Sequence, residues 1–337
     1  MDKIVQKQTN PLGAAPVGKL LAKFAVPSII SMLVGALYNV VDQIFIGQGV
    51  GMLGNAATNV AFPLVTIATS MALLVGIGAA SGFSLALGAN DRDGAARIAA
   101  NGISWLVIFG LALCAATLVF LQPLMLAFGA TETVLPYALT YTGITAFGTP
   151  FLLFSTGGSH LVRADGSPVQ SMVCVLSGAI LNTILDPLLI FTFGMGIAGA
   201  AYATVAGQIL SAVLVARYLA RFRTVPLQRA YLRPRLPLLR RIATLGMAAS
   251  FNQLAMTVVQ ITMNNTLTHY GARSDYGADI PLAVVGVISK VNILYMALIV
   301  GIAQGCQPIF GFNYGARNYG RVKQTYRLAV MVASIIS

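Results

Sequence analysis

Long apolar runs separated by short polar clusters define the pattern of this chain. The runs recur from residue 20 to the end, and the clusters between them are rich in charged residues, glycine and proline. About 20 mostly apolar helical residues cross the hydrocarbon core of a bilayer, and these runs reach that length. The pattern predicts nine membrane-spanning helices at 20–47, 57–87, 97–122, 133–160, 169–194, 198–221, 238–269, 281–311 and from 322 onward.

The composition supports a membrane protein. Hydrophobic residues make up 57% of the chain and charged residues only 9%, whereas soluble domains carry about 25% charged residues. The mean hydropathy is +0.80. We therefore expect an all-α, multi-pass membrane protein, and the prolines inside its spans predict kinked helices (Pro27, Pro63, Pro150, Pro187 and Pro308).

The positive charge of the chain is distributed by loop. The formal net charge is +12, and all Lys and Arg residues except Arg273 and Lys290 lie in the amino-terminal segment or in alternate loops. By the positive-inside rule this bias predicts an amino terminus on the inner side of the membrane. A nucleic-acid binder would gather its cations on one folded face, so we expect no nucleic acid as partner. Anionic lipid head groups are the expected partners of the basic loops.

The sequence contains an internal repeat. The segments MALLVGIGAA (71–80) and MALIVGIAQG (296–305) match at most positions. The first segment lies in the second predicted helix and the other in the eighth, six helices later. Because six is an even number, both copies cross the membrane in the same direction. We expect two parallel six-helix repeats around a central cavity: an amino-terminal lobe at 1–221, a flexible basic inner linker at 222–237, and a carboxy-terminal lobe at 238–337. The second copy is expected to be incomplete, without helices 10 to 12, and the protein to be a monomer.

Three ionisable residues fall well inside predicted spans: Asp42, Asp186 and Lys290. Charges within a bilayer are costly and usually face a partner or a cavity. Counting about 1.5 Å per residue from the predicted outer ends places Asp42 and Asp186 at similar depth, with Thr204 on the next helix. Asn182 lies one helical turn before Asp186, on the same face. Their oxygens suit a hard cation such as Na⁺, or a shared proton; alternatively, the two acids bond to helix backbones at the membrane edge.

Other polar residues and prolines in the spans are secondary candidates. Pro187 removes a backbone donor and frees the carbonyl of Thr183. The polar seventh helix, which contains no carboxylate, lines a cavity or bonds to neighbouring helices. The candidates for gating or coupling are Lys290, Pro27 and Pro187, and those for a substrate cavity are Tyr38, Asn39, Asn252, Gln253, Gln260 and Asn264.

Several of these features together resemble the multidrug and toxic compound extrusion (MATE) family. One feature is the pair of parallel lobes. In the first helix a Pro is followed by an Asp, and this Asp belongs to the motif VDQIFIG. The other two features are the LGAND loop and the motif LNTILDP in the fifth helix. The resemblance implies a bacterial cytoplasmic-membrane antiporter that exports amphipathic or cationic organic compounds against H⁺ or Na⁺. In members with an ion site in the amino-terminal lobe, the ion-binding residues match Asp42, Asn182, Asp186 and Thr204 here. A second branch uses a carboxylate on the seventh helix, which this chain lacks.

Three alternatives to a drug exporter remain at this level. A flippase for lipid-linked oligosaccharide precursors shares the arrangement of two lobes. Such a protein would favour a strongly cationic cavity, and Lys290 is the single cation predicted inside the spans. A polytopic membrane enzyme would need a nucleophile or metal cluster at one face, and the sequence offers none. A passive channel is disfavoured by the repeat and the paired acids. We expect no enzyme activity, no cofactor, and no metal site beyond Na⁺ at Asp42 and Asp186.

Overall fold

Long helices dominate the chain, as the hydropathy pattern predicts. The structure, a computed structural model, describes residues 10–271 and 279–336, and in this part it contains no strand. Its nine long helices are α2 (Val17–Gly49), α3 (Met52–Gly88), α4 (Arg92–Val119), α6 (Leu135–Ala164), α7 (Pro168–Pro187), α8 (Gly196–Leu219), α9 (Leu236–Gly271), α10 (Asp279–Gly315) and α11 (Tyr319–Ile336). Short elements are α1 (Pro11–Ala14), α5 (Leu121–Ala127), a π-helical turn η1 (Leu188–Thr192) and a 3₁₀ turn η2 (Arg229–Leu232). The all-α fold is confirmed.

Seven segments of the described helices are long and apolar enough to cross a membrane. They comprise α2, α3, α4, α7 with η1, α8, and parts of α9 and α10. The remaining two long helices are more polar: α6 is rich in Thr, Ser and Gly, and α11 carries Arg321, Lys323 and Arg327. Nine helices are thus found where nine spans were predicted, and seven meet the hydropathy criterion.

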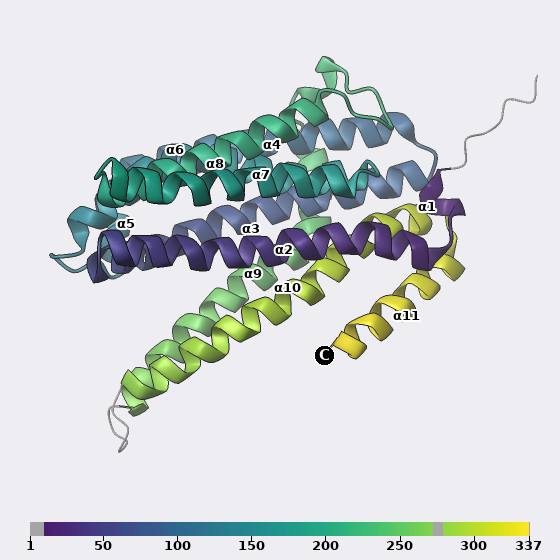
Figure 1. Ribbon diagram of the computed structural model, residues 1–337. Helices are drawn as coiled ribbons and strands as arrows, with labels where there is room; N and C mark the ends of the chain where they lie inside the picture. Colours follow the sequence, from purple (N-terminus) through teal and green to yellow (C-terminus); the bar gives the residue numbers. More distant parts are fainter. Residues whose placement is uncertain (1–9, 272–278, 337) are drawn as a thin grey trace, which may run out of the picture.

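The turns between helices alternate between two ends of the bundle (Figure 1). One end holds α1 and the turns after α3, α6, α8 and α10; the opposite end holds α5 and the turns after α2 and η1. We call the first the basic end, because it carries Lys19, the Arg residues from 217 to 241 and Arg317. The observed arrangement matches the loop-by-loop charge bias of the sequence.

The carboxy-terminal helices meet the amino-terminal lobe near the basic end. In Figure 1, α9 and α10 cross α2 and α3 there and diverge from them toward the opposite end. The contact depends on glycine: a Cβ at Gly246 would lie 1.9 Å from the carbonyl oxygen of Leu74, and one at Gly78 would lie 2.0 Å from that of Ile242. The backbones of α3 and α9 therefore touch directly, as small residues permit in membrane helices.

Polar contacts reinforce this junction between the lobes. The Ser70 and Ser250 hydroxyls lie 2.6 Å apart in a buried position. The Gln307 amide donates to the carbonyl oxygen of Ile77 at 3.1 Å and to the Ser81 hydroxyl at 2.9 Å. The structure thus shows the lobes joined at the basic end and separated toward the opposite one.

The segment between the lobes is bound to the amino-terminal lobe. The Asp165 carboxylate accepts hydrogen bonds from the Arg223 and Thr224 backbone N–H groups at 2.9 and 3.0 Å. Further along, Asn101 donates to the carbonyl oxygen of Tyr231 at 3.0 Å and accepts from the N–H of Arg235 at 2.8 Å. Side chains from the turn after α6 and from α4 thus hold the linker at two points in this structure, while its flexibility stays a prediction.

Candidate cation-binding site

Three of the four predicted site residues form a buried chain of contacts between α7 and α8. Asp186 and Asn182 are both buried, and the Asn182 amide donates to the Asp186 carboxylate at 3.3 Å. The same amide nitrogen lies 3.4 Å from the Thr204 hydroxyl oxygen, to which it also donates. The helical period placed Asn182 and Asp186 on one face, and the structure brings Thr204 of the next helix against that face.

A close approach of two helices produces this arrangement. At Gly207 of α8, a Cβ would lie 2.6 Å from the carbonyl oxygen of Gly178 and 3.2 Å from the Cβ of Asn182. Glycine at both positions lets the α7 and α8 backbones approach, so that the Asn182 amide reaches across to Thr204.

The α-helix changes its winding directly after Asp186. Helix α7 ends at Pro187 and continues as the π-helical turn η1. Proline lacks the N–H that an α-helix would use, and single π turns often occur at functional sites. The predicted disruption at Pro187 is therefore observed as a change of helix type, and it lies next to the buried carboxylate.

Asp42 reaches the same cluster from α2. It lies seven residues before the end of α2 at Gly49, while Asp186 lies six residues before the end of η1 at Thr192, so the depths agree. The two carboxyl groups lie within electrostatic range of each other, and α2 packs against α7. Tyr38, one turn before Asp42, is half-buried and lies within electrostatic range of both acids. All four predicted ion-site residues thus come together.

Sequence reasoning missed Tyr141 as a member of this cluster. Its side chain on α6 is buried, lies within electrostatic range of Asp42 and Asp186, and lines the same small cavity as Thr204. The depth count used for the acids also applies to it, because Tyr141 lies six residues after the start of α6 at Leu135. A search for charged residues alone passed over this neutral phenol.

The cluster has oxygen acceptors without donors. Asp42 Oδ1, Asp186 Oδ2 and Asn182 Oδ1 are buried, and none has a hydrogen-bond partner in the described part of the chain. Among the side chains that the structure describes, which do not include Lys290, neither acid forms an ion pair with Lys or Arg. Buried acceptors and charges require compensation. Oxygen ligands of this kind suit a hard cation or a proton.

Little free space adjoins the cluster inside the lobe. A cavity of about 50 Å³ is lined by Tyr141 and Thr204, together with Gln208 and apolar residues of α3 and α4. Such a volume holds a few waters or one small ion. An organic compound of drug size needs a cavity of several hundred Å³, so this cavity is too small to hold one.

The secondary candidates are dispersed. Pro27 is buried inside a continuous α2, and Asn39 is exposed, with its amide donating to the carbonyl oxygen of Gly35 at 2.7 Å. Asn252 is exposed and Gln253 half-exposed, directly after Ser250 of α9. The side chains of Gln260, Asn264 and Lys290 lie outside the described residues. Of the secondary candidates with described side chains, Tyr38 and Pro187 therefore lie beside the two acids, whereas Pro27, Asn39 and Asn252 are not found in contact with them.

The fold and the buried acids define an all-helical, multi-span membrane transporter. The sequence model of the MatE family matches residues 27–188 and 248–337, which is well over half of the chain. The chain therefore belongs to the MatE family of multidrug efflux transporters. It is a transporter and not an enzyme.

Relatives and solved structures agree with this assignment. The multidrug export protein MepA of Staphylococcus aureus is 26% identical over 323 residues, which cover 96% of this chain and 70% of the relative. MepA of Staphylococcus haemolyticus is 24% identical over 319 residues, or 94% and 69% of the two chains. A crystal structure of MATE in complex with MaD3S superposes with a TM-score of 0.89 at 26% identity, covering 97% of this chain and 72% of that one. An outward-facing multidrug resistance MATE family transporter gives a TM-score of 0.88 at 26% identity, with 97% and 71% covered.

Proposed function

We propose that this protein exports amphipathic organic cations in exchange for an ion bound between Asp42 and Asp186. The observation that carries the proposal is the buried Asp186 and the half-buried Asp42, each with a buried carboxyl oxygen that has no partner, and neither with a cationic partner among the side chains that the structure describes. A site of net negative charge inside a membrane is stabilised by taking up a cation or a proton. The relatives' description as multidrug export proteins supports organic compounds as the cargo.

A proton is the favoured coupling ion. Two neighbouring carboxylates repel each other when both are charged, so the pair is stabilised when one of them takes up a proton. Na⁺ is the alternative, and it would use the unpartnered oxygens of Asp42, Asn182 and Asp186 as ligands.

Exchange follows if ion and cargo prefer different arrangements of the lobes. In this structure the lobes meet at the basic end and diverge at the other, with that basic end proposed to face the cytoplasm. Ion binding at α2, α7 and α8 would change the packing of α2, which also contacts α10 of the second lobe. A ligand shifts such an equilibrium only by its difference in affinity for the two states.

A vesicle experiment tests this function. The purified chain is reconstituted into proteoliposomes with ethidium outside and an imposed gradient of H⁺ or of Na⁺. Transporters inserted inside out should carry dye into the vesicle lumen. We expect dye to accumulate there when the lumen is acidic, and more weakly or not at all when only Na⁺ is enriched in it. Accumulation that follows only the Na⁺ gradient would reassign the coupling ion. Dye movement that depends on neither gradient would contradict antiport.

A further inference from the structure

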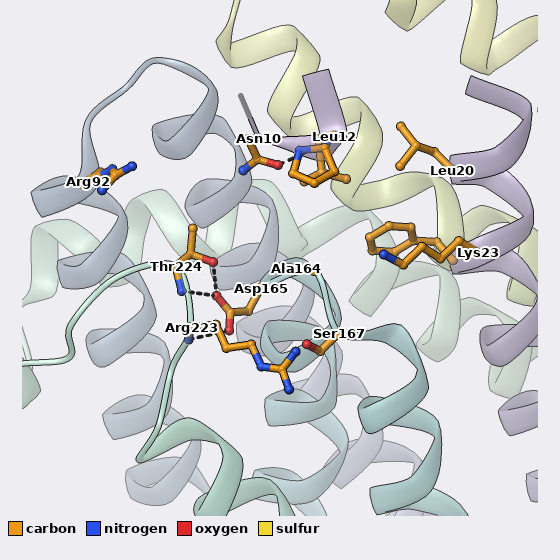
Figure 2. A pocket seen from close by; sticks show the side chains of 13 residues that line it. Asn10, Leu12, Leu20, Lys23, Arg92, Ala164, Asp165, Ser167, Arg223 and Thr224 are labelled. Atoms are coloured by element: carbon orange, nitrogen blue, oxygen red, sulfur yellow. Dashed lines mark hydrogen bonds between the residues drawn. The ribbon is translucent and has the colours of Figure 1, made fainter. Parts of the chain in front are cut away.

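A cavity of about 790 Å³ lies at the basic end, far along α2 and α7 from the carboxyl cluster. Its walls are α1, the first turns of α2, the start of α4, the turn between α6 and α7, and the beginning of the linker (Figure 2). The charged residues that line it are Lys23, Arg92, Asp165 and Arg223. Figure 2 shows the three cationic side chains approaching this space from different sides.

The cavity carries uncompensated positive charge. Its one carboxylate, Asp165, accepts the two linker N–H groups already described, and also accepts from the Tyr218 hydroxyl at 2.8 Å and from the Thr224 hydroxyl. Neither Lys23, Arg92 nor Arg223 forms an ion pair within the portion of the chain that the structure describes. Asp165 keeps its negative charge in these bonds to neutral donors, so the three cations leave the cavity with a net positive charge that suits an anionic ligand.

Exposed apolar side chains continue from this cavity along the bundle. On α2, Val26 and Ile30 follow Lys23 at one and two helical turns and are 51% and 38% exposed. On α7, which packs against α2, Val169 and Val173 are 53% and 41% exposed. A cationic pocket with apolar helix faces below it matches a phospholipid, whose charged head group is attached to acyl chains.

We propose that this cavity binds the phosphate head group of an anionic phospholipid, whose acyl chains lie along the exposed faces of α2 and α7. Basic pockets at the ends of transmembrane helices bind anionic head groups through localised charge, in contrast to the diffuse attraction of scattered surface cations. A phospholipid and a soluble head-group compound would both present a phosphate ester to the cavity. The exposed apolar faces of α2 and α7 favour the phospholipid, because they can contact its acyl chains.

The walls of the cavity connect the two lobes. Segment α1 is held by the second lobe, since Asn313 donates to the carbonyl oxygen of Leu12 at 3.0 Å and Arg321 donates to that of Ala15 at 2.6 Å. The other walls, including Lys23 and Arg223, belong to the first lobe and its linker. A bound head group therefore contacts both sides of the junction and stabilises the arrangement that is joined at the basic end.

Lipid binding to the full chain in detergent tests the proposal. The apparent affinity for phosphatidylglycerol is measured by native mass spectrometry, with phosphatidylcholine as the zwitterionic comparison and glycerol 3-phosphate as the soluble head group. We expect the Lys23→Gln, Arg223→Gln double variant to bind phosphatidylglycerol at least about tenfold more weakly. The matched control Arg240→Gln, Arg241→Gln removes two exposed cations of the same end, outside the cavity, and should change the affinity less than about twofold.

The two double variants distinguish a specific head-group site from diffuse attraction between surface cations and lipid. Equal weakening in both would show diffuse attraction and overturn the proposal. Binding of glycerol 3-phosphate as tight as that of the lipid would assign the cavity to a free phosphate ester and overturn the lipid assignment. The melting temperature without lipid checks folding. If the double variant does not fold, Lys23→Gln alone, a substitution on the exposed side of α2, must still weaken lipid binding.

Discussion

Replacing Asp42 by asparagine is expected to reduce ion-driven ethidium efflux to the background of cells that lack the protein. The carboxyl group lies within electrostatic range of Asp186, and one of its oxygens is buried without a partner in the described part of the chain. Asparagine has nearly the same shape but can neither release a proton nor contribute negative charge to a cation. The ion-driven step should therefore fail while packing is preserved, because removing a poorly compensated buried charge does not destabilise the fold.

The control for this variant is Glu132→Gln. Glu132 is exposed in the turn between α5 and α6, at the same end of the bundle as the carboxyl cluster, and its neutral variant should export dye like the wild type. Membrane abundance of each variant is measured by immunoblot. Efflux by Asp42→Asn at the wild-type rate, with normal abundance, would remove Asp42 from the coupling mechanism.

Replacing Gly246 by valine is expected to hold the lobes apart at the basic end. Even a Cβ at this position would lie 1.9 Å from the Leu74 carbonyl oxygen, so α9 must move away from α3. Overpacking of this kind costs about 1–3 kcal/mol, which corresponds to about a 5- to 150-fold shift between two conformations. Dye efflux should fall accordingly, because a transporter held in one arrangement cannot complete its cycle.

The native Cys306 reports this change directly. It is buried between α10 and α2, where it packs with Leu21 and Ala25. With Cys114 and Cys174 replaced by alanine, maleimide labelling of Cys306 should be slow in the wild type and faster in Gly246→Val. The control is Gly35→Val, because a Cβ at Gly35 meets nothing within 4 Å. Equal labelling rates in Gly246→Val and the control would contradict the role of this glycine contact.

Much of the site could be predicted from local rules. Helical periodicity placed Asn182 and Asp186 on one face, and rise per residue placed Asp42 and Thr204 at the same depth. These rules work because membrane helices are long and regular, and because buried charge is costly enough to be rare. Tyr141 was missed since a buried phenol is common in helical proteins, so only its position in the fold, beside the same cavity as Thr204 and within electrostatic range of the acids, reveals its place.

The behaviour of the linker depends on contacts that sequence patterns do not encode. Its Arg-rich composition is typical of a solvated loop, yet Asp165 and Asn101 fix it to the amino-terminal lobe through backbone hydrogen bonds. The divergence of α9 and α10 from the first lobe likewise depends on where glycines allow helices to touch, at Gly78 and Gly246. Both features concern tertiary packing between segments distant in sequence, where local propensity carries no information.

Ion release on dye binding tests the central claim most directly. Ethidium is added to the purified protein in weakly buffered detergent solution, and protons are followed with a pH indicator, or Na⁺ with a radioactive tracer. If the cluster of Asp42, Asn182, Asp186 and Thr204 exchanges its ion for cargo, the wild type releases protons, or Na⁺, in proportion to the dye bound. The Asp42→Asn, Asp186→Asn variant should release neither. Equal release by wild type and variant, or dye binding by the wild type without release of either ion, would contradict the account.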